Sequence, residues 1–492
     1  MLDTHKFITI EKWICGLLVC ATIALSANAH KVAGMTLPLP WDDEASFIWP
    51  AVSFMEHGTL QSDYLNPERP IMWMPPGYML LLGTIFRATG YSLEIARWLS
   101  WIFMMAAYFA AVALLWSRPL RLFSVGLCSA LWLGGTFVSI GNIARMDSLT
   151  FAIALCGYLL ITRNLPYAGL ALLFINILVH PNGVYFLTVA IGYQLIIYRT
   201  TWPIIKRSEV VALVVASVLI MLYGAYVLQN RAAFIQDMAM QFGRKGDRNP
   251  IHNIMSGNNF WYFGALSIVS LYFAARRSPL LLYVGLTAAC FSVSRIGMEM
   301  WYEVFAEFSF VMMSIGCLWF AWYIFTKIRF HVVIAYALVC FLFFPILLFH
   351  YRNGFIPGPR NWPAKLTWGW GMKTETEIPY FTQSDYRTIQ AAIEQILSIN
   401  NHIPARVSFY PRGEGLFFHN AWKDKAYVYA PHFTSELADI YVVRESRYTP
   451  PWQQSRSEQY VNAVPPDAKP VIARDESEIW FIYQAKSANH TN

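Results

Sequence analysis

Long apolar stretches separated by short polar segments fill the first 350 residues of the chain. Twelve such stretches stand out, and most approach the roughly 20 apolar residues that a helix needs to cross a bilayer. They cover about 14–33, 71–90, 95–116, 120–139, 149–162, 166–180, 182–198, 209–228, 259–275, 278–294, 301–325 and 330–350. This pattern predicts a polytopic α-helical membrane protein.

Charges in the short loops set the expected topology, because Lys and Arg gather in cytoplasmic loops. The basic loops contain Arg118, Arg121, Arg163, Arg199, Lys206, Arg207, Arg276, Arg277, Lys327 and Arg329. All of these can be cytoplasmic only if the stretch 71–90, which contains Pro75-Pro76-Gly77, does not cross. We therefore expect about eleven transmembrane helices, with interfacial helices in a first external loop at 34–94. A helix from Glu44 would place Phe47, Ala51, Phe54 and Met55 on one apolar face, which is typical of an interfacial amphipathic helix.

The pattern changes after residue 350. Ser384 can cap a helix whose apolar face carries Ile389 and Ile393, and short strand-like runs follow at 405–410, 426–430, 438–444 and 478–483. We expect a transmembrane module at 1–350, a linker rich in Pro, Gly and Trp at 351–380, and a small extracytoplasmic α/β domain at 381–492.

Composition agrees with a membrane protein. The chain is 56% hydrophobic and only 14% charged, whereas soluble domains contain about 25% charged residues. The net charge is +7, but no basic run interleaved with aromatic residues suggests nucleic acid as a partner. Residues 13–29 resemble a signal peptide ending in Ala27-Asn28-Ala29. We favour an uncleaved first span, because so many spans follow.

Candidate chemistry begins at Trp41-Asp42-Asp43-Glu44, directly after the first apolar stretch. A carboxylate near lipid costs free energy unless it is solvated, paired or used. Helix capping is the alternative role, since acids are favoured at a helix N-terminus. Arg145-x-Asp147 lies on the same predicted side, either as a local ion pair or with Asp147 facing the same cavity.

Two further groups of polar residues fall on the predicted external side. One is the loop 229–258, a solvated turn or a clamp for phosphate, with Arg244, Lys245, Arg248 and His252. The other is one helix face with Glu299, Glu303 and Glu307 at four-residue spacing. These acids have two expected roles: a structural one, by pairing with Arg295 or by a buried hydrogen bond, or the recognition of sugar hydroxyls or amines. His180-Pro181-Asn182-Gly183 is interpreted mainly as a turn, with the recognition of sugar hydroxyls or amines as the alternative. All seven cysteines lie in apolar stretches without C-x-x-C, so no disulfide framework or zinc site is expected.

The order of these motifs resembles the GT-C glycosyltransferases. An acidic pair after the first span is followed by Pro75-Pro76-Gly77-Tyr78, then Leu93-Glu94-Ile95-Ala96-Arg97, then Arg145-x-Asp147. The branch with protein O-mannosyltransferases and the aminoarabinose transferase of lipid A (glycosyltransferase family 39-like) is the most similar. The resemblance covers about 10–200, and only the topology is similar beyond that.

The resemblance implies inverting transfer of a sugar from a polyprenyl-phosphate donor to a glycan, lipid or protein acceptor. The site and C-terminal domain would face the periplasm at a bacterial inner membrane. Asp43 matches the base, Glu44 the acid beside it, and Asp147 a second acid that orients a substrate or binds a divalent cation; no other cofactor is expected. Expected substrate-binding residues are Tyr78, Arg97, Arg145, Arg69, Arg244, Lys245, Arg248, His252, Glu299 and Glu303.

The sequence departs from this family at two points. Met74 stands where relatives often have a lysine that would meet the lipid phosphate, and Arg69 is the nearest upstream cation. The Arg-Tyr pair of many relatives near a late span is missing or replaced by Arg295.

Two other functions remain open. A surface-polysaccharide ligase or polymerase with a lipid-diphosphate donor fits the basic 229–258 loop, although such enzymes usually lack an early Asp-Glu pair. A lipid or sugar transporter would be expected to show related halves around a mid-membrane site, and no internal repeat is apparent.

Overall fold

The computed structural model describes residues 4–35, 42–66, 68–200, 203–245, 258–297, 302–327 and 341, then 383–399 and short segments between 405 and 484. Inside residues 4–327 the described secondary structure is helical. The helices are α1 (Thr4–Met35), α2 (Asp42–His57), α3 (Gly77–Thr89), α4 (Leu93–Leu115), α5 (Arg121–Trp132), α6 (Gly135–Gly141), α7 (Met146–Thr162), α8 (Pro166–Asn176), α9 (Gly183–Ile197), α10 (Arg207–Gln229), α11 (Arg231–Lys245), α13 (Asn258–Ala275), α14 (Leu281–Gly297) and α15 (Glu303–Lys327).

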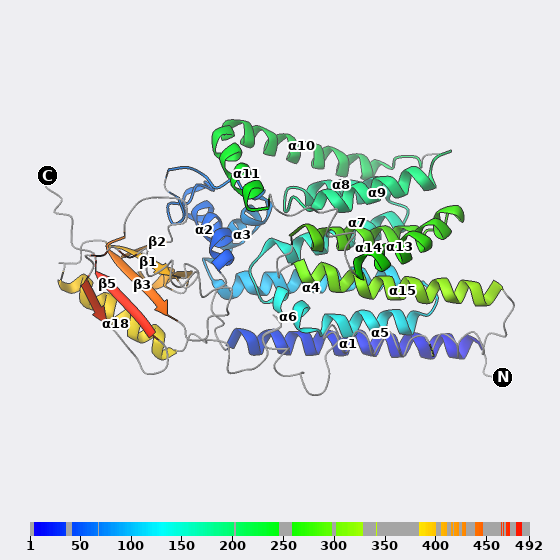
Figure 1. Ribbon diagram of the computed structural model, residues 1–492, viewed down its shortest axis with the longest axis horizontal. Helices are drawn as coiled ribbons and strands as arrows, with labels where there is room; N and C mark the ends of the chain where they lie inside the picture. The colour runs from blue at the N-terminus through cyan, green and yellow to red at the C-terminus, as the bar shows by residue number, and fades with distance from the viewer. Residues whose placement is uncertain are drawn as a thin grey trace.

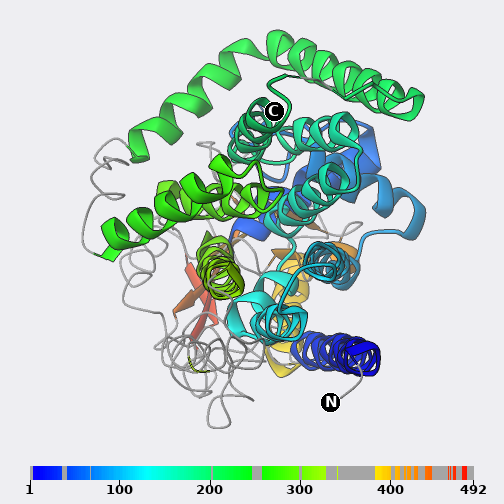
Figure 2. The same ribbon diagram turned by 90° about the vertical axis from the view of Figure 1, so that its right-hand side faces the viewer.

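Most of these helices lie along one axis and form an elongated bundle (Figure 1). Viewed along that axis, α10 lies at the edge of the bundle (Figure 2). Four helices are long and apolar enough to cross a membrane, and six shorter apolar helices accompany them among the described residues. The α10 surface exposes Val211, Val214, Met221 and Leu222. An apolar helix exposed in this way is suited to contact with lipid, so the polytopic membrane fold predicted from the sequence is confirmed.

One expected span is broken. The stretch 120–139 forms α5 and then α6, which are separated at Leu133-Gly134. The backbone N–H of Gly134 bonds to the carbonyl of Leu131, which tightens the end of α5. Gly134 and Gly135 together weaken the helix at this point because glycine loses more backbone entropy than other residues.

Close packing holds the bundle together. Trp132 is buried against Phe137 and Phe151, with ring centroids 4.7 and 5.8 Å away. Helices α7 and α8 meet at Gly157 and Gly169, where a Cβ on Gly169 would lie 2.6 Å from the Gly157 carbonyl oxygen. A side chain at Gly169 would therefore push the two helices apart.

The two ends of the bundle carry different charged segments. At one end, Arg121 pairs with Glu11 of α1 at 3.5 Å, and the Lys206 ammonium donates to the Asn164 carbonyl oxygen at 2.9 Å. Helices α2, α3 and α11 and the C-terminal domain lie at the opposite end (Figure 1). Basic loops and the acidic segment thus lie at opposite ends, as the loop charges predict.

Helices α2 and α3 cover the end of the bundle opposite the basic loops. Helix α3 has 13 residues and spans about 20 Å, less than the roughly 30 Å of a hydrocarbon core. The sequence predicted one apolar face on α2, but residues 44–53 are all buried. The expectation of a single apolar face was wrong, because α3 and residues of the C-terminal domain share a core cluster with α2.

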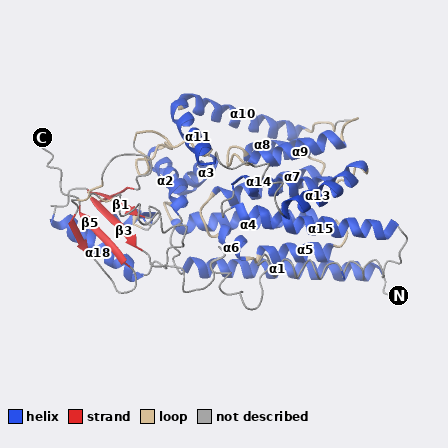
Figure 3. Ribbon diagram, in the orientation of Figure 1, coloured by secondary structure: helices blue, strands red, loops and turns tan. Residues whose placement is uncertain are grey.

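The described strands belong to a C-terminal α/β domain (Figure 3). Its five-stranded sheet has the order β2-β1-β3-β5-β4. The central strand pairs are parallel from β2 to β3, whereas β5 is antiparallel to β3 and β4. The elements are α18 (Gln383–Ile399), β1 (Ala405–Tyr410), α19 (His419–Trp422), β2 (Ala426–Tyr429), β3 (Ile440–Glu445), β4 (Lys469–Ile472) and β5 (Ile479–Gln484).

The four strands expected from the sequence are present, and so is the helix whose apolar face was expected at Ile389 and Ile393, both buried. Strand β4 was missed. It is short, contains Pro470 and lies at the sheet edge, where a missing N–H is tolerated. The expected span at 330–350 (apart from Phe341) and the linker at 351–380 lie outside the described residues.

Candidate functional site

The first turn of α2 is held by a buried ion pair. Arg97, in the second turn of α4, donates from Nε and Nη2 to the two oxygens of Glu44 at 3.1 and 2.9 Å. The Ala144 N–H donates to the same carboxylate at 2.8 Å, and Glu44 is fully buried. Bidentate charge-assisted bonds of this kind are strong and geometrically specific. They fix α2 against α4 and against the segment that precedes α7.

A second buried ion pair lies at the start of α7. It contacts α2 about one helical turn after Glu44. Arg145 immediately precedes α7 and donates from Nε to Oδ2 of Asp147 at 2.9 Å. Its guanidinium carbon lies 5.4 Å from the ring centroid of Phe47 on α2. Asp147 is fully buried in the first turn of α7, where the helix dipole favours a carboxylate. The expected local ion pair is therefore present.

The other oxygen of Asp147 faces an imidazole. Buried Oδ1 accepts no hydrogen bond from the described residues, and Nε2 of His180 lies 3.9 Å away. The Asn182 N–H donates to Nδ1 of His180 at 3.0 Å, so a neutral ring carries its hydrogen on Nε2. The Tyr302 hydroxyl lies 3.4 Å from that Nε2. An acceptor oxygen of Asp147 and the Nε2 atom of His180 thus lie close together.

We call Glu44, Arg97, Arg145, Asp147, His180 and Tyr302 the polar cluster. The sequence did not assign His180 or Tyr302 to a site. The turn expected at His180 is present, since the Gly183 N–H bonds to the His180 carbonyl oxygen at 2.9 Å. The missed signal was topological: α7 and α8 are consecutive helices, so the end of α8 returns to the end where α7 begins.

The Pro75-Pro76-Gly77 motif brings α3 against the same turn. The Gly77 N–H donates to the Leu178 carbonyl oxygen at 2.8 Å, and a Cβ on Gly77 would lie 2.6 Å from that oxygen. Glycine is therefore required for this approach. Tyr78 is fully buried, with its ring centroid 6.1 Å from that of Phe47.

Asp42 and Asp43 begin α2, directly before the anchored Glu44. Their side chains lie outside the described residues. The base assigned to Asp43 by resemblance therefore stays a prediction, as does the capping role of Asp42.

Arg69 is bound to an acid that the sequence did not single out. Its Nη2 donates to Oδ1 of Asp237 at 2.6 Å, and the Met72 N–H donates to Oδ2 at 2.6 Å. Asp237 is fully buried on α11. This contact joins α11 to the first loop and neutralises much of the charge that Arg69 would present to a phosphate.

Several residues near the expected substrate site, or their side chains, lie outside the described part of the chain. Arg244 and Lys245 end α11, but their side chains lie outside the described residues, as does that of Arg295 on α14. Arg248, His252 and Glu299 also lie outside the description. Their roles stay predictions.

The described glutamates of the expected acidic helix face begin α15. Glu303 is exposed in its first turn, and buried Glu307 accepts a hydrogen bond from the Thr136 hydroxyl at 2.6 Å. The contact joins α15 to α6. For Glu307, a structural hydrogen bond was one of the two expected roles.

Among the described side chains, no three from His, Cys, Asp and Glu gather as metal ligands. Near Asp147, His180 is a possible second ligand among the described residues, and the Arg145 cation already contacts Oδ2. The described residues thus do not form a complete ligand set for the divalent cation considered above.

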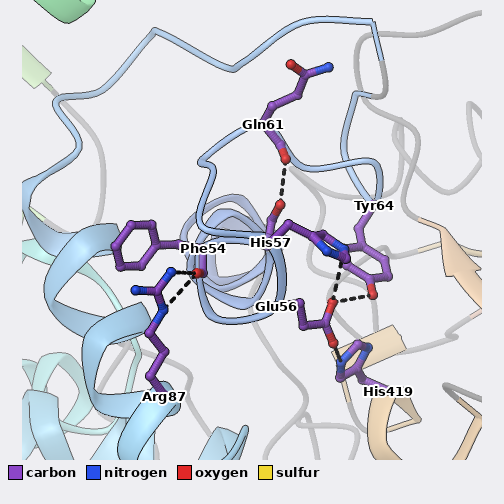
Figure 4. A network of polar contacts seen from close by, with 8 residues as sticks. Phe54, Glu56, His57, Gln61, Tyr64, Arg87 and His419 are labelled. Atoms are coloured by element: carbon purple, nitrogen blue, oxygen red, sulfur yellow. Dashed lines mark hydrogen bonds and ion pairs between the residues drawn. The ribbon is translucent and has the colours of Figure 1, made fainter.

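A second polar network lies at the other end of α2 (Figure 4). Glu56 contacts His419 of the C-terminal domain at 3.2 Å and accepts a hydrogen bond from the Tyr64 hydroxyl at 3.0 Å. Burial alone would raise the pKa of Glu56, but the hydrogen bond and charge of His419 outweigh it and lower that pKa. Arg87 of α3 donates to the Phe54 carbonyl oxygen at 2.7 and 3.1 Å.

No protein-family model and no curated protein matches this chain. Among solved structures, the chain is similar to ArnT from Cupriavidus metallidurans bound to undecaprenyl phosphate, at 12% sequence identity and a TM-score of 0.43. The match covers 94% of this chain and 97% of that one.

Proposed function

We propose that the chain is an inverting glycosyltransferase that moves a sugar from a polyprenyl-phosphate donor to a hydroxyl of a cell-envelope acceptor. One observation carries the proposal: the motifs of the GT-C resemblance meet in space. Glu44, Arg97 and Ala144 are joined by hydrogen bonds, and Asp147 lies in the next ion pair. This cluster lies at one end of a bundle of apolar helices, where a lipid-linked donor would place its phosphate.

The reaction requires a base and a leaving group on opposite faces of the sugar. In the proposal, the Asp43 carboxylate takes the proton of the acceptor hydroxyl, and that oxygen forms a bond to the anomeric carbon. The bond from the anomeric carbon to the phosphate oxygen breaks, and polyprenyl phosphate leaves with the electron pair. Attack opposite the leaving group inverts the configuration, and a positioned base typically contributes about 10²- to 10⁴-fold.

The polar cluster supplies position. The Glu44–Arg97 pair would hold the first turn of α2, and with it Asp43, since both residues lie in that turn. The Asp147 Oδ1 acceptor and the His180 Nε2–H donor would together bind one sugar hydroxyl. A hydroxyl suits this pair because it can donate to the carboxylate and accept from the imidazole.

The leaving phosphate requires a cation. Arg97 and Arg145 are each paired with a buried carboxylate, and Arg69 is paired with Asp237. In the proposal the phosphate is therefore bound by Arg244, Lys245 and Arg248 at and after the end of α11. The site would face the periplasm of a bacterial inner membrane, since the positive-inside rule assigns the opposite, basic end to the cytoplasm.

The test compares Asp43→Asn with Asp42→Asn in cells that lack the chromosomal gene. Lipid A, polysaccharide and protein glycans from each strain are measured by mass spectrometry, and purified protein is assayed for release of polyprenyl phosphate from a panel of polyprenyl-phosphate sugars. We expect the wild type and Asp42→Asn to restore one missing sugar. Asp43→Asn should insert normally and fail to restore it.

Three results would contradict the proposal. Full activity of Asp43→Asn would remove the base. Transfer from an added polyprenyl-diphosphate-linked sugar, with release of polyprenyl diphosphate, and no transfer from the polyprenyl-phosphate sugars would favour the ligase or polymerase class. A cytoplasmic signal from a reporter fused after residue 351 would place the C-terminal domain on the wrong side.

A further inference from the structure

The C-terminal domain places one histidine against residues 42–91, the segment that contains α2 and α3. His419 begins α19 and is 3% exposed. The rings of Trp49, Tyr64 and Tyr91 surround it edge-on, with centroids 5.4, 5.3 and 5.1 Å from the imidazole. Trp49 and Tyr64 also stack on each other at 4.6 Å. The enclosure is therefore made by α2 and by the segments on either side of α3.

Polar contacts also join the C-terminal domain to α2 and to the segments beside α3, with hydrogen-bond donors on both sides. His419 Nε2 lies 3.2 Å from Oε1 of Glu56, whose other oxygen accepts from Tyr64 (Figure 4). The Tyr91 hydroxyl donates to the Leu416 carbonyl oxygen at 2.7 Å, and the Asn420 side chain donates back to the Tyr91 carbonyl oxygen at 3.0 Å. Three such contacts around one enclosed ring make this a specific contact between the two parts. We call His419 and the residues around it, Trp49, Glu56, Tyr64 and Tyr91, the seat.

Helix α2 connects this seat to the candidate site. Glu56 is near its end and Glu44 is in its first turn, about 18 Å apart along the helix axis. Pro50 lies between them and cannot donate the N–H that would bond to the Ser46 carbonyl. A helix weakened at its centre depends on anchors at both ends. Arg97 anchors Glu44 at one end, and His419 contacts Glu56 at the other.

Packing couples the two anchors. Trp49 and Val52 of α2 belong to the same buried cluster as Phe409 and Phe418 of the C-terminal domain. The same cluster extends through Phe47 to Met146, next to Asp147. Because buried side chains are close-packed, a shift at the seat displaces neighbours toward the first turn.

We propose that His419 is a positioning residue: by enclosing its ring against α2, the C-terminal domain holds the first turn of that helix in register with the polar cluster. The domain thereby becomes a working part of the membrane module. The mechanical coupling stands on the geometry alone, and only its effect on sugar transfer rests on the proposed function.

Hydrogen–deuterium exchange of the full-length protein in lipid nanodiscs tests the coupling. We expect His419→Ala to speed exchange about tenfold through residues 42–57, including the first turn, because local opening of the whole helix becomes easier. His419→Gln places an amide N–H near the position of Nε2 and should recover most of the protection. Asp439→Ala, which removes an exposed pair with Arg406 in the same domain, is the matched control and should change nothing in α2.

The inference is overturned if His419→Ala speeds exchange only in residues 50–57, since the seat would then be a local contact. It is also overturned if Asp439→Ala has the same effect, since the loss would then reflect general loosening of the domain. If His419→Ala does not fold, Glu56→Gln is measured instead, because it keeps side-chain shape and leaves the C-terminal domain intact. Unchanged exchange at residues 42–49 in Glu56→Gln would then reject the coupling.

Activity gives a separate readout. Where transfer is measurable, His419→Ala should lower kcat about tenfold with little change in KM for the donor, since the base is displaced and the lipid contacts remain. His419→Gln should restore kcat. If Asp43→Asn proves fully active while His419→Ala still loosens residues 42–49, the proposed function fails and the coupling stands.

Discussion

The Nε2 atom of His180 lies 3.9 Å from the Oδ1 atom of Asp147, a buried oxygen that accepts no hydrogen bond from the described residues. Burial of an unpaired carboxylate oxygen costs free energy. The distance is too long for a direct hydrogen bond. Under the proposed function, a sugar hydroxyl that contacts both atoms would satisfy this oxygen.

The first prediction separates the two ring nitrogens of His180. In His180→Asn, the amide oxygen can replace Nδ1 as the acceptor for the Asn182 N–H, so the turn is kept, but the Nε2–H donor is lost. We expect near wild-type thermal stability and a decrease in kcat/KM of about 10²-fold, comparable with removal of one preorganised donor. Wild-type kinetics in this variant would leave His180 with its turn role alone. His180→Ala should lose stability as well.

The second prediction concerns the Glu44–Arg97 pair. Glu44→Gln leaves the Arg97 guanidinium buried without its counter-ion, and breaking such a pair typically costs about 3–5 kcal/mol. We expect a clear fall in the unfolding temperature for Glu44→Gln and for Arg97→Met. The double variant should be more stable than the sum of the two losses predicts, because neither partner is left charged alone. Additive losses would show that the two side chains do not interact in the folded protein.

The contrast between the His180–Asp147 contact and the Glu44–Arg97 pair shows which parts of the structure could be predicted from the sequence pattern. Apolar length and loop charge predicted the bundle, its two ends and the C-terminal strands, because lipid burial and orientation depend on composition over many residues. The family resemblance, through the order of the motifs, assigned Glu44, Arg97 and Asp147 to one site. His180, Tyr302 and Asp237 were not assigned because their partners lie far away in the chain, and one sequence carries no signal for a distant partner.

Helix α2 shows a second limit. Its pattern predicted one apolar face, yet both faces are buried because a domain more than 300 residues later packs on it. Glu44 and Ser46 are buried on this helix, and Glu56, which is exposed near its end, contacts His419 and Tyr64. The hydrophobic periodicity of a helix alone does not reveal a distant domain that covers its polar face with polar groups.

The third prediction tests whether Arg69 is structural. Asp237 is fully buried and holds both the Arg69 guanidinium and the Met72 N–H. Arg69→Met and Asp237→Asn should each lower stability by about 2 kcal/mol, somewhat less than a fully buried pair because Arg69 is partly exposed. The losses should not add in the double variant. A large rise in KM for the donor in Arg69→Met, without loss of stability, would instead assign Arg69 to phosphate binding.

The last prediction follows from the lowered pKa of Glu56. Its ordinary value is 4.5, and His419 holds the folded-state pKa below that value. A carboxyl with a lowered folded-state pKa contributes stability that is fully present above its ordinary pKa and is lost as the pH falls through the folded one. His57, His419, Tyr64 and Asp63 are the other titratable groups that face Glu56 or act on its partner Tyr64. Glu56→Gln removes only the carboxyl titration and leaves the others in place.

Thermal unfolding of wild type and Glu56→Gln between pH 3 and pH 7 isolates this contribution. The wild type should be the more stable protein at pH 6, and the difference should shrink below pH 4.5 and vanish once Glu56 is protonated. Exchange protection of residues 42–57 should fall over the same pH range in the wild type and stay nearly flat in Glu56→Gln. A constant difference across the range would mean that packing of the His419 ring, and not the charge on Glu56, holds the C-terminal domain on α2.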